Sequence, residues 1–143
     1  MKYSVGSWSH RSAILKGMTN KIEVNKNGAL AHKVRLVANA IHGKKARDIR
    51  AFDVRGLTLI ADAFVLCTAT SEPQLKAVSS AAREAAREEG HAVLRVEGDH
   101  KCGWLIIDLG DVILHVFRAQ ARDFYDLDRM WADAPELPLH LEE

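Results

Sequence analysis

The clearest hydrophobic pattern of the chain is a pair of apolar runs on either side of a turn within residues 104–117. The Leu109-Gly110 pair, with an aspartate before and after it, is a turn signal, so the segment predicts a β-hairpin. Successive side chains of a strand point to opposite faces, and this turn would set Asp108 opposite Asp111. One face is then aliphatic, with Leu105, Ile107, Val112, Leu114 and Val116. The other face mixes aromatic rings, a histidine and carboxylates: Trp104, Ile106, Asp108, Asp111, Ile113, His115 and Phe117. We expect helices to cover the aliphatic face and a partner to bind the mixed face.

Two further segments carry apolar residues at helical spacing. The first stripe holds Leu30, Val34, Val37, Ala38 and Ile41. Gly43 follows it as a stop signal, and Lys33 lies off the stripe. The second helix begins at Ser71, the predicted N-cap, with a proline in its first turn and Gln74 at the reciprocal capping-box position. Its apolar stripe holds Leu75, Val78, Ala82, Ala85 and Ala86, and Gly90 ends it.

The remaining segments complete the predicted order of elements. Residues 48–54 and 91–96 are strand candidates, and residues 63–67 have the composition of a strand buried on both faces. Residues 118–131 predict one helix, with Phe124, Leu127 and Trp131 on the same side. Together these elements predict an α/β domain: a mixed β-sheet of about five strands, with helices packed mainly on one side.

Three parts of the chain differ in character. Residues 1–28 hold five basic residues against the single acid Glu23, and we interpret them as a flexible basic N-terminal extension. An organelle transit segment and a nucleic-acid arm rank second and third. Residues 29–131 form the predicted domain. Residues 132–143 contain two prolines and end in acids, which predicts a loosely held C-terminal tail.

Composition narrows the functional classes. The 143 residues suffice for one substantial core, and the formal net charge of +1 argues against non-specific nucleic-acid binding, which needs a cationic surplus. No apolar stretch has the length of a membrane span. The two cysteines, Cys67 and Cys102, show no disulfide spacing, so we expect a reducing, cytoplasmic environment.

An enzymatic hypothesis starts from the hydroxyl-bearing residues 68–71, which run into a helix N-terminus and could cradle a phosphate. Glu97, Asp99 and Asp108 could then converge on a divalent metal for nucleotidyl transfer. However, the chain has no glycine-rich phosphate loop, and Ser71 already serves as a helix cap. Metal-ligand spacing and a nucleophile elbow are absent as well. We therefore rank a metal-dependent nucleotidyltransferase as the alternative.

A binding function starts from the mixed hairpin face. Trp104, Asp108, His115 and Phe117 share this face, and Arg122 and Tyr125 follow shortly after it: tryptophan, tyrosine and arginine are the residue types that dominate interface energetics. If a C-terminal segment folded over the face instead, Trp104 would be an ordinary core residue. Residue types favour binding over this structural alternative.

Three motifs resemble signatures of the ribosomal silencing factor (iojap-related) family. They are ADAFVLCTATS at residues 61–71, EGDHKCGWLIIDLGDVILHVF at residues 97–117 and RDFYDLDRMW at residues 122–131. The resemblance covers roughly residues 30–131 in the right order, and three linked motifs are more specific than any one of them. Ala69 stands where the family usually has glycine, which weakens the phosphate-cradle hypothesis.

The resemblance implies a non-enzymatic translation repressor without a cofactor, with a nucleotidyltransferase-like topology that lacks the catalytic residues. Such proteins bind the fourteenth protein of the large ribosomal subunit and block joining of the small subunit when nutrients are scarce. They often form homodimers. The resemblance places the partner contact at Trp104, Asp108, Leu109, Phe117 and Tyr125. His115 and Arg122 match motif positions where contact with the partner and support of the fold both remain open.

Overall fold

A five-stranded mixed sheet forms the centre of the computed structural model, which describes residues 13–99 and 101–142. The strands are β1 (Arg47–Asp53), β2 (Ala63–Ala69), β3 (Arg95–Asp99), β4 (Trp104–Asp108) and β5 (Val112–Arg118). Their order in space is β1-β2-β5-β4-β3, and only the β2–β5 pair is parallel. The predicted α/β class with a mixed sheet of about five strands is confirmed.

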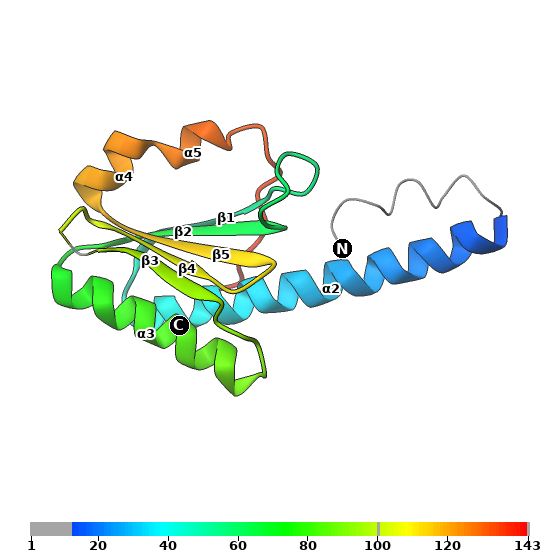
Figure 1. Ribbon diagram of the computed structural model, residues 1–143, viewed down its shortest axis with the longest axis horizontal. Helices are drawn as coiled ribbons and strands as arrows, with labels where there is room; N and C mark the ends of the chain where they lie inside the picture. The colour runs from blue at the N-terminus through cyan, green and yellow to red at the C-terminus, as the bar shows by residue number, and fades with distance from the viewer. Residues whose placement is uncertain (1–12, 100, 143) are drawn as a thin grey trace.

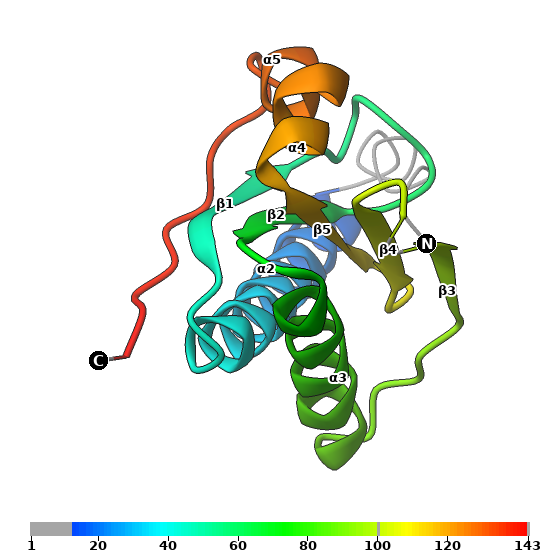
Figure 2. The ribbon, with the colours of Figure 1, turned by 90° about the vertical axis from the view of Figure 1, so that its left-hand side faces the viewer.

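Two long helices, α2 (Ala13–His42) and α3 (Glu72–Glu88), pack against one face of the sheet (Figures 1 and 2). Two short helices, α4 (Ala119–Tyr125) and α5 (Leu127–Met130), lie on the opposite face. The core is accordingly split into two clusters. The cluster beneath α2 and α3 contains Leu105, Ile107, Val112, Leu114 and Val116. The other contains Ile113 and Phe117, with Trp104 and Ile106 packed against it. The predicted division of the hairpin into an aliphatic and a mixed face is confirmed.

The hairpin turn is longer than predicted. Asp108 pairs with Ile113 rather than Asp111, and the Leu109 N–H donates a 2.9 Å hydrogen bond to the carbonyl oxygen of Val112. The Asp108 carboxylate accepts a hydrogen bond from the Gly110 N–H, the local geometry that aspartate favours in turns. Because the register differs by two residues, the paired strand residues keep their predicted faces. Asp111 does not: it lies in the turn before β5, and its carboxylate contacts Lys33 of α2, on the opposite side from the mixed face.

Helix α2 runs through the predicted boundary at residue 28. Its residues 13–28 are therefore helical and continuous with the domain, whereas residues 1–12 lie outside the described residues. Gly28 is tolerated within the helix at a modest cost and has open space around it. The buried stripe matches the prediction, and one basic residue joins it: Lys33 is only 7% exposed.

Helix α3 begins as predicted. The Ser71 hydroxyl accepts a 3.1 Å hydrogen bond from the Gln74 N–H, and the Gln74 side chain accepts hydrogen bonds from the Thr70 N–H and hydroxyl. Strand β2, which precedes it, is buried along its whole length. The buried residues of α3 are Leu75, Val78, Ser79, Ala82 and Ala86, whereas Ala85 is partly exposed.

The strand predicted at residues 91–96 lies further along the chain, at β3, and all its residues are exposed. Residues 97–99, which lie beyond the predicted strand, are thus part of an edge strand. Gly98 in β3 has φ +88°, and a Cβ atom there would lie 2.1 Å from the carbonyl oxygen of Trp104. This close approach requires glycine and sets the position of the first residue of β4.

The single helix predicted over residues 118–131 is wrong. Asp126 adopts a left-handed conformation (φ 51°, ψ 47°) and separates α4 from α5. Aspartate tolerates this conformation better than most residues, so the break needs no glycine. As a result Leu127 is buried, whereas Phe124 is 81% exposed and does not share its side.

The C-terminal residues are held more firmly than the prediction of a loose tail. The Asp53 N–H donates to the Pro135 carbonyl oxygen, and the Leu137 N–H donates to the Ala51 carbonyl oxygen, each at 2.8 Å. Leu137 and Leu139 also pack against the core. The prolines of this segment suggested a loose tail because proline is rare in central strands. Proline is nevertheless compatible with hydrogen bonding along the edge of a sheet, as here beside β1.

Candidate functional site: a partly exposed aromatic cluster

The candidate site is built around Trp104, the first residue of β4. Its ring is partly exposed and contacts three aromatic neighbours on β5 and α4. Ring centroids lie 5.1 Å from Phe117, 4.5 Å from Tyr125 and 5.9 Å from His115. Phe124 extends the cluster through an edge-on contact of 5.1 Å with Tyr125. We call these five residues the aromatic cluster.

His115 forms the inner wall of the aromatic cluster. The Trp104 Nε1–H donates a 3.1 Å hydrogen bond to the His115 Nδ1, and the His115 ring meets Phe64 edge-on at 5.0 Å. Burial lowers the pKa of His115 to about 4. The imidazole is therefore neutral near pH 7, and an Nδ1 that accepts a hydrogen bond leaves the proton on Nε2.

The predicted contact residues differ sharply in accessibility. Tyr125 is 40% exposed, and Trp104 and Asp108 are partly exposed, so a partner can reach these side chains. Phe117 is fully buried and supports the Trp104 ring from below. Leu109 is 2% exposed and belongs to the other core cluster, beneath α2 and α3. Its side chain does not share a surface with the aromatic cluster.

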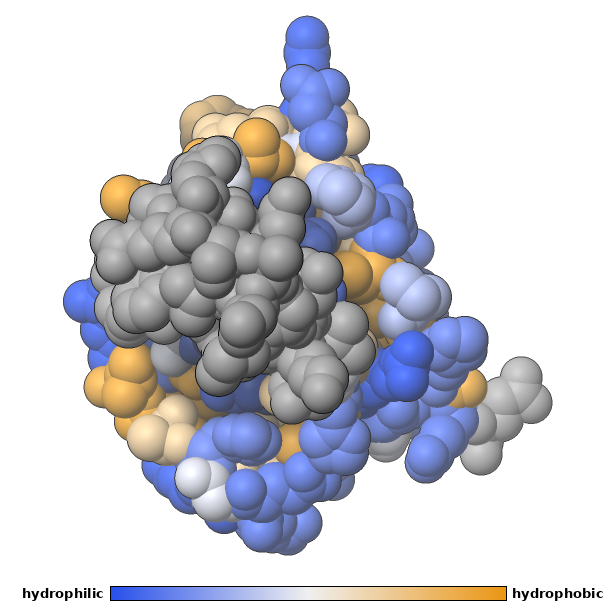
Figure 3. Space-filling model, turned by 90° about the vertical axis from the view of Figure 1, so that its right-hand side faces the viewer, coloured by the Kyte–Doolittle hydropathy of each residue, from blue (hydrophilic) through white to orange (hydrophobic). Residues whose placement is uncertain are grey.

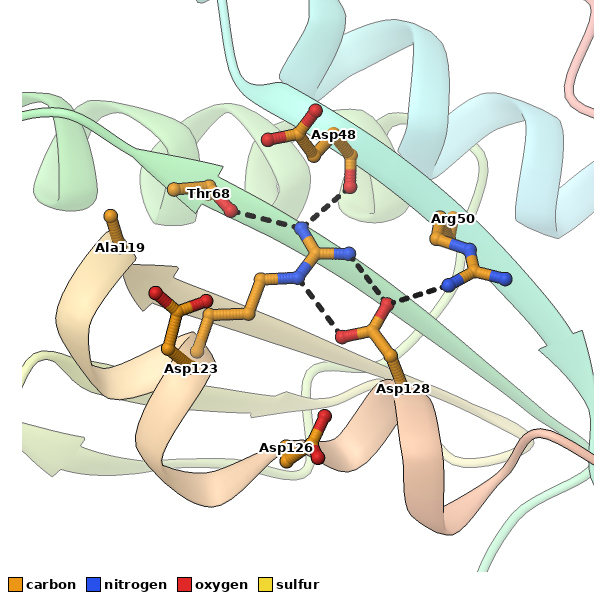
Figure 4. Close-up of a pocket in the computed structure, with 8 residues that line it drawn as sticks. Asp48, Arg50, Thr68, Ala119, Asp123, Asp126 and Asp128 are labelled. Atoms are coloured by element: carbon orange, nitrogen blue, oxygen red, sulfur yellow. Dashed lines mark hydrogen bonds and ion pairs between the residues drawn. The ribbon is translucent and has the colours of Figure 1, made fainter.

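Arg122 is a structural clasp. Its guanidinium donates to the Asp48 carbonyl oxygen at 2.6 Å, to the Thr68 hydroxyl at 2.9 Å and to both carboxylate oxygens of Asp128 (Figure 4). The Arg122 side chain is only 10% exposed. Hydrogen bonding and charge attraction from Arg122, assisted by Arg50, lower the pKa of Asp128. The clasp therefore fixes α4 and α5 against β1 and β2.

A cavity of about 430 Å³ opens beside this clasp. Acidic side chains dominate its lining: Asp48, Asp123, Asp126 and Asp128, together with Arg50, Thr68, Ala119 and Arg122. The guanidinium groups of Arg50 and Arg122 both donate to the Asp128 carboxylate (Figure 4), and Arg50 also donates to Glu136. The charges of Arg50 and Arg122 are thus neutralised by contacts that hold α4 and α5 in place.

The large apolar residues that are exposed fall into three sets, and of these the sequence patterns singled out only Tyr125 as a contact residue. One lies in the loop after β1 (Leu57, Leu59 and Ile60), one near the β3 edge (Leu94 and Val96) and one on α4 and α5 (Phe124, Tyr125 and Met130). The third set is continuous with the aromatic cluster through the Tyr125–Trp104 contact. Where Figure 3 shows described residues, the hydrophobic areas are separate and lie among larger hydrophilic ones. Phe124 was predicted on the same side as Leu127, and the break at Asp126 separates the two: Leu127 is buried and Phe124 is exposed.

The arrangement needed by the enzymatic alternative is not found among residues 13–99 and 101–142. There, no three His, Cys, Asp or Glu side chains are grouped as metal ligands would be. Asp99 pairs with Trp104 and Asp108 with Arg95, so the two carboxylates sit at opposite ends of the β3–β4 pair, about 13 Å apart at the usual rise per residue. Burial also raises the pKa of Cys67 to about 12, which suppresses the thiolate.

Fold and site thus define an α/β protein with a mixed five-stranded sheet and an aromatic cluster on the face away from its two long helices. Within the described part of the chain, no helix is both long and apolar enough to cross a membrane.

Comparison with known proteins identifies the family. The model of one family, Ribosomal silencing factor during starvation, matches residues 27–143. Ribosomal silencing factor RsfS of Halalkalibacterium halodurans is 40% identical over 106 residues, which cover 74% of this chain and 91% of the relative. The chloroplastic protein Iojap of Arabidopsis thaliana is 32% identical over 134 residues, which cover 93% of this chain and 55% of the relative. The chain belongs to the ribosomal silencing factor family.

Solved structures agree in fold. A crystal structure from Bacillus halodurans superposes with a TM-score of 0.63 at 36% identity and covers 73% of this chain and 94% of its own. A crystal structure of a Chromobacterium violaceum protein gives a TM-score of 0.68 at 26% identity, with coverage of 78% and 92%. The nucleotidyltransferase-like topology expected from the family resemblance stays a prediction.

Proposed function

We propose that this protein represses translation by binding the large ribosomal subunit through its fourteenth protein and blocking the entry of the small subunit under nutrient limitation. Membership of the ribosomal silencing factor family supports a regulatory role at the ribosome. The observation that carries the choice of surface is the partly exposed Trp104 ring, set between Tyr125 and the buried Phe117.

The aromatic cluster has the character of a binding hot spot. Interface energy concentrates in large aromatic side chains that are pre-set by packing and surrounded by weaker contacts. Trp104 and Tyr125 are held by ring contacts on their inner side and are open on the other, and Phe124 presents most of its surface to solvent. These side chains would bind the partner without a large loss of conformational entropy.

The proposed mechanism is steric occlusion and requires no chemistry. A domain of this size, bound to one protein of the large subunit, occupies space that the small subunit needs. Asp108 lies at the far end of β4 from Trp104, with its carboxylate 3.5 Å from Arg95. We propose that Asp108 acts at the rim, where charge affects the association rate and the register more than the affinity.

Co-sedimentation with purified large subunits tests the proposal. Trp104→Ala should weaken binding by at least ~2 kcal/mol, the usual threshold of a hot spot, while the circular dichroism spectrum shows an unchanged fold. Leu59→Ala is the matched control, because Leu59 is 68% exposed in the loop after β1 and belongs to a different exposed set. Unchanged co-migration of Trp104→Ala would remove Trp104 from the interface.

We further propose that the protein acts in the cytoplasm and forms a homodimer in its free state. The proposal rests on family resemblance, although the name of one relative places it in a chloroplast. Sedimentation equilibrium across a range of protein concentrations measures the dimer directly. A single monomeric mass at the highest concentration would contradict it.

A further inference from the structure

His115 is a polar side chain in a position that an apolar ring could fill. Its side chain is 6% exposed, and its ring is surrounded by Phe64, Trp104 and Phe117 at centroid distances of 5.0, 5.9 and 6.2 Å. Its Nε2 atom is buried and has no hydrogen-bond partner. A buried, unpaired N–H costs free energy, and phenylalanine would fill the same space without that cost. Some other property of histidine must therefore compensate.

The compensating property is the acceptor at Nδ1. The hydrogen bond from the Trp104 Nε1–H to this atom is 3.1 Å long and partly buried. It fixes which edge of the indole points inward, because only the edge that carries the Nε1–H can donate to this acceptor. The hydrogen bond also requires the proton of the neutral imidazole to sit on Nε2, which accounts for the unpaired atom.

We propose that His115 is a positioning residue: through its Nδ1 it holds the Trp104 indole in the orientation that binds the partner. The inference rests on the proposed function and deepens it, since Trp104 is the contact residue and His115 acts through it. Pre-organised side chains bind more tightly because less freedom is lost on association. Without the acceptor, the indole populates other orientations, and affinity falls in proportion to the population lost.

Two substitutions separate the acceptor from the packing. His115→Asn is smaller but places an amide oxygen the same number of bonds from Cβ as Nδ1, so it can accept from Trp104. His115→Phe keeps an aromatic ring and removes the acceptor. If His115 only filled space, Phe would be the better replacement. If it positions Trp104, Asn is the better one.

The direct readout is the indole Nε1–H resonance of Trp104 in the ¹⁵N-labelled protein, assigned by its loss in Trp104→Phe. We expect His115→Phe to shift this resonance upfield and to speed its hydrogen exchange by about tenfold or more, whereas His115→Asn retains most of the protection. An unchanged resonance in a folded His115→Phe protein would overturn the proposal. His115→Leu, which is smaller, serves the same purpose if Phe is not accommodated.

Affinity for the large subunit gives the second readout. His115→Phe should bind about fivefold more weakly, the factor expected for one neutral hydrogen bond, and His115→Asn should bind within about twofold of the wild type. In a Trp104→Phe background, His115→Phe should have no further effect, because the donor is already gone. Equal binding by wild type and His115→Phe would refute the positioning role alone. Failure of the wild type to bind would refute the proposed function and, with it, the binding role of His115.

Discussion

A half-buried ion pair joins helix α2 to the turn of the hairpin, and substitutions of its two residues should differ in their effect on stability. The Lys33 Nζ donates to the Leu109 carbonyl oxygen at 2.6 Å and to the Asp111 carboxylate at 2.5 Å. The Lys33 side chain is 9% exposed, whereas the Asp111 side chain is 40% exposed. The lysine is therefore enclosed, and the aspartate still reaches water.

This asymmetry sets the expected costs. Asp111→Asn leaves an enclosed ammonium facing neutral oxygens; removing one partner of a fully buried pair costs 3–5 kcal/mol, and the partial exposure of Asp111 reduces this to about 2 kcal/mol. Lys33→Met keeps an unbranched apolar stem and leaves the carboxylate free to hydrate. Its main cost is the unpaired Leu109 carbonyl oxygen, about 1 kcal/mol. Asp111→Asn should thus be the more destabilising change.

Urea denaturation of the two single variants and the double variant measures these costs, provided that the denaturant slope m stays constant. The double variant should resemble Lys33→Met, because once the ammonium is gone the carboxylate has little left to neutralise. Ile41→Val, in the same helix and fully buried, calibrates an ordinary loss of packing at about 1 kcal/mol. Asp111→Asn proving no more destabilising than Lys33→Met would refute the reasoning.

Two further predictions concern the site. Burial lowers the folded-state pKa of His115 to about 4, below the value of a histidine in the unfolded chain. The neutral imidazole therefore contributes its full stabilisation above about pH 6.5, and this stabilisation is lost as the pH falls toward 4. The free energy of unfolding should fall by about 2 kcal/mol from pH 7.5 to pH 5, and His115→Phe should remove most of this dependence in parallel denaturation series; an identical slope in both proteins would contradict it. Arg122→Lys should lower the free energy of unfolding by about 2 kcal/mol in the same assay, because an ammonium cannot reproduce the two parallel contacts with Asp128. Arg129→Lys, on the exposed face of α5, is the control and should change it by less than about 0.5 kcal/mol. Equal effects of the two arginine substitutions would argue against the clasp.

The parts of the fold that the sequence predicted correctly are those in which one local rule dominates. Strict alternation in the hairpin assigned the strand residues of β4 and β5 to the correct faces even though the turn was longer than expected, because a shift of two residues preserves parity. The Ser71 cap was predictable because its hydrogen bond lies within a single turn of helix.

The errors arose where a distant partner decides the structure. Lys33 was predicted to lie off the buried stripe of α2, but its ammonium is buried because it binds the Leu109 carbonyl oxygen and the Asp111 carboxylate, more than seventy residues away. The left-handed Asp126 interrupts a segment whose apolar spacing continues through it. The spacing of apolar residues along the chain records neither the contacts of Lys33 nor the backbone conformation of Asp126.

The candidate site shows the same division. Sequence reasoning placed Trp104, His115 and Phe117 on one face, and the structure brings them together with Tyr125. Sequence reasoning did not predict how deeply each residue is buried. Phe117 and His115 are buried, Leu109 lies in the opposite core cluster, and the Arg122 guanidinium binds the Asp128 carboxylate of α5. Depth depends on which helices cover each face of the sheet, which is a property of the assembled fold.

The hydrogen bonds between the C-terminal residues and β1 have a practical consequence. Shortening the chain before Pro135 would remove these hydrogen bonds and expose backbone N–H and C=O groups along the outer edge of β1. The sheet would then have two uncovered edge strands, because β3 lies at its opposite edge. Copies of such a protein would tend to associate through their exposed strand edges, and this association could be mistaken for the proposed homodimer. Expression plasmids meant for oligomerisation studies should therefore retain the C-terminal residues.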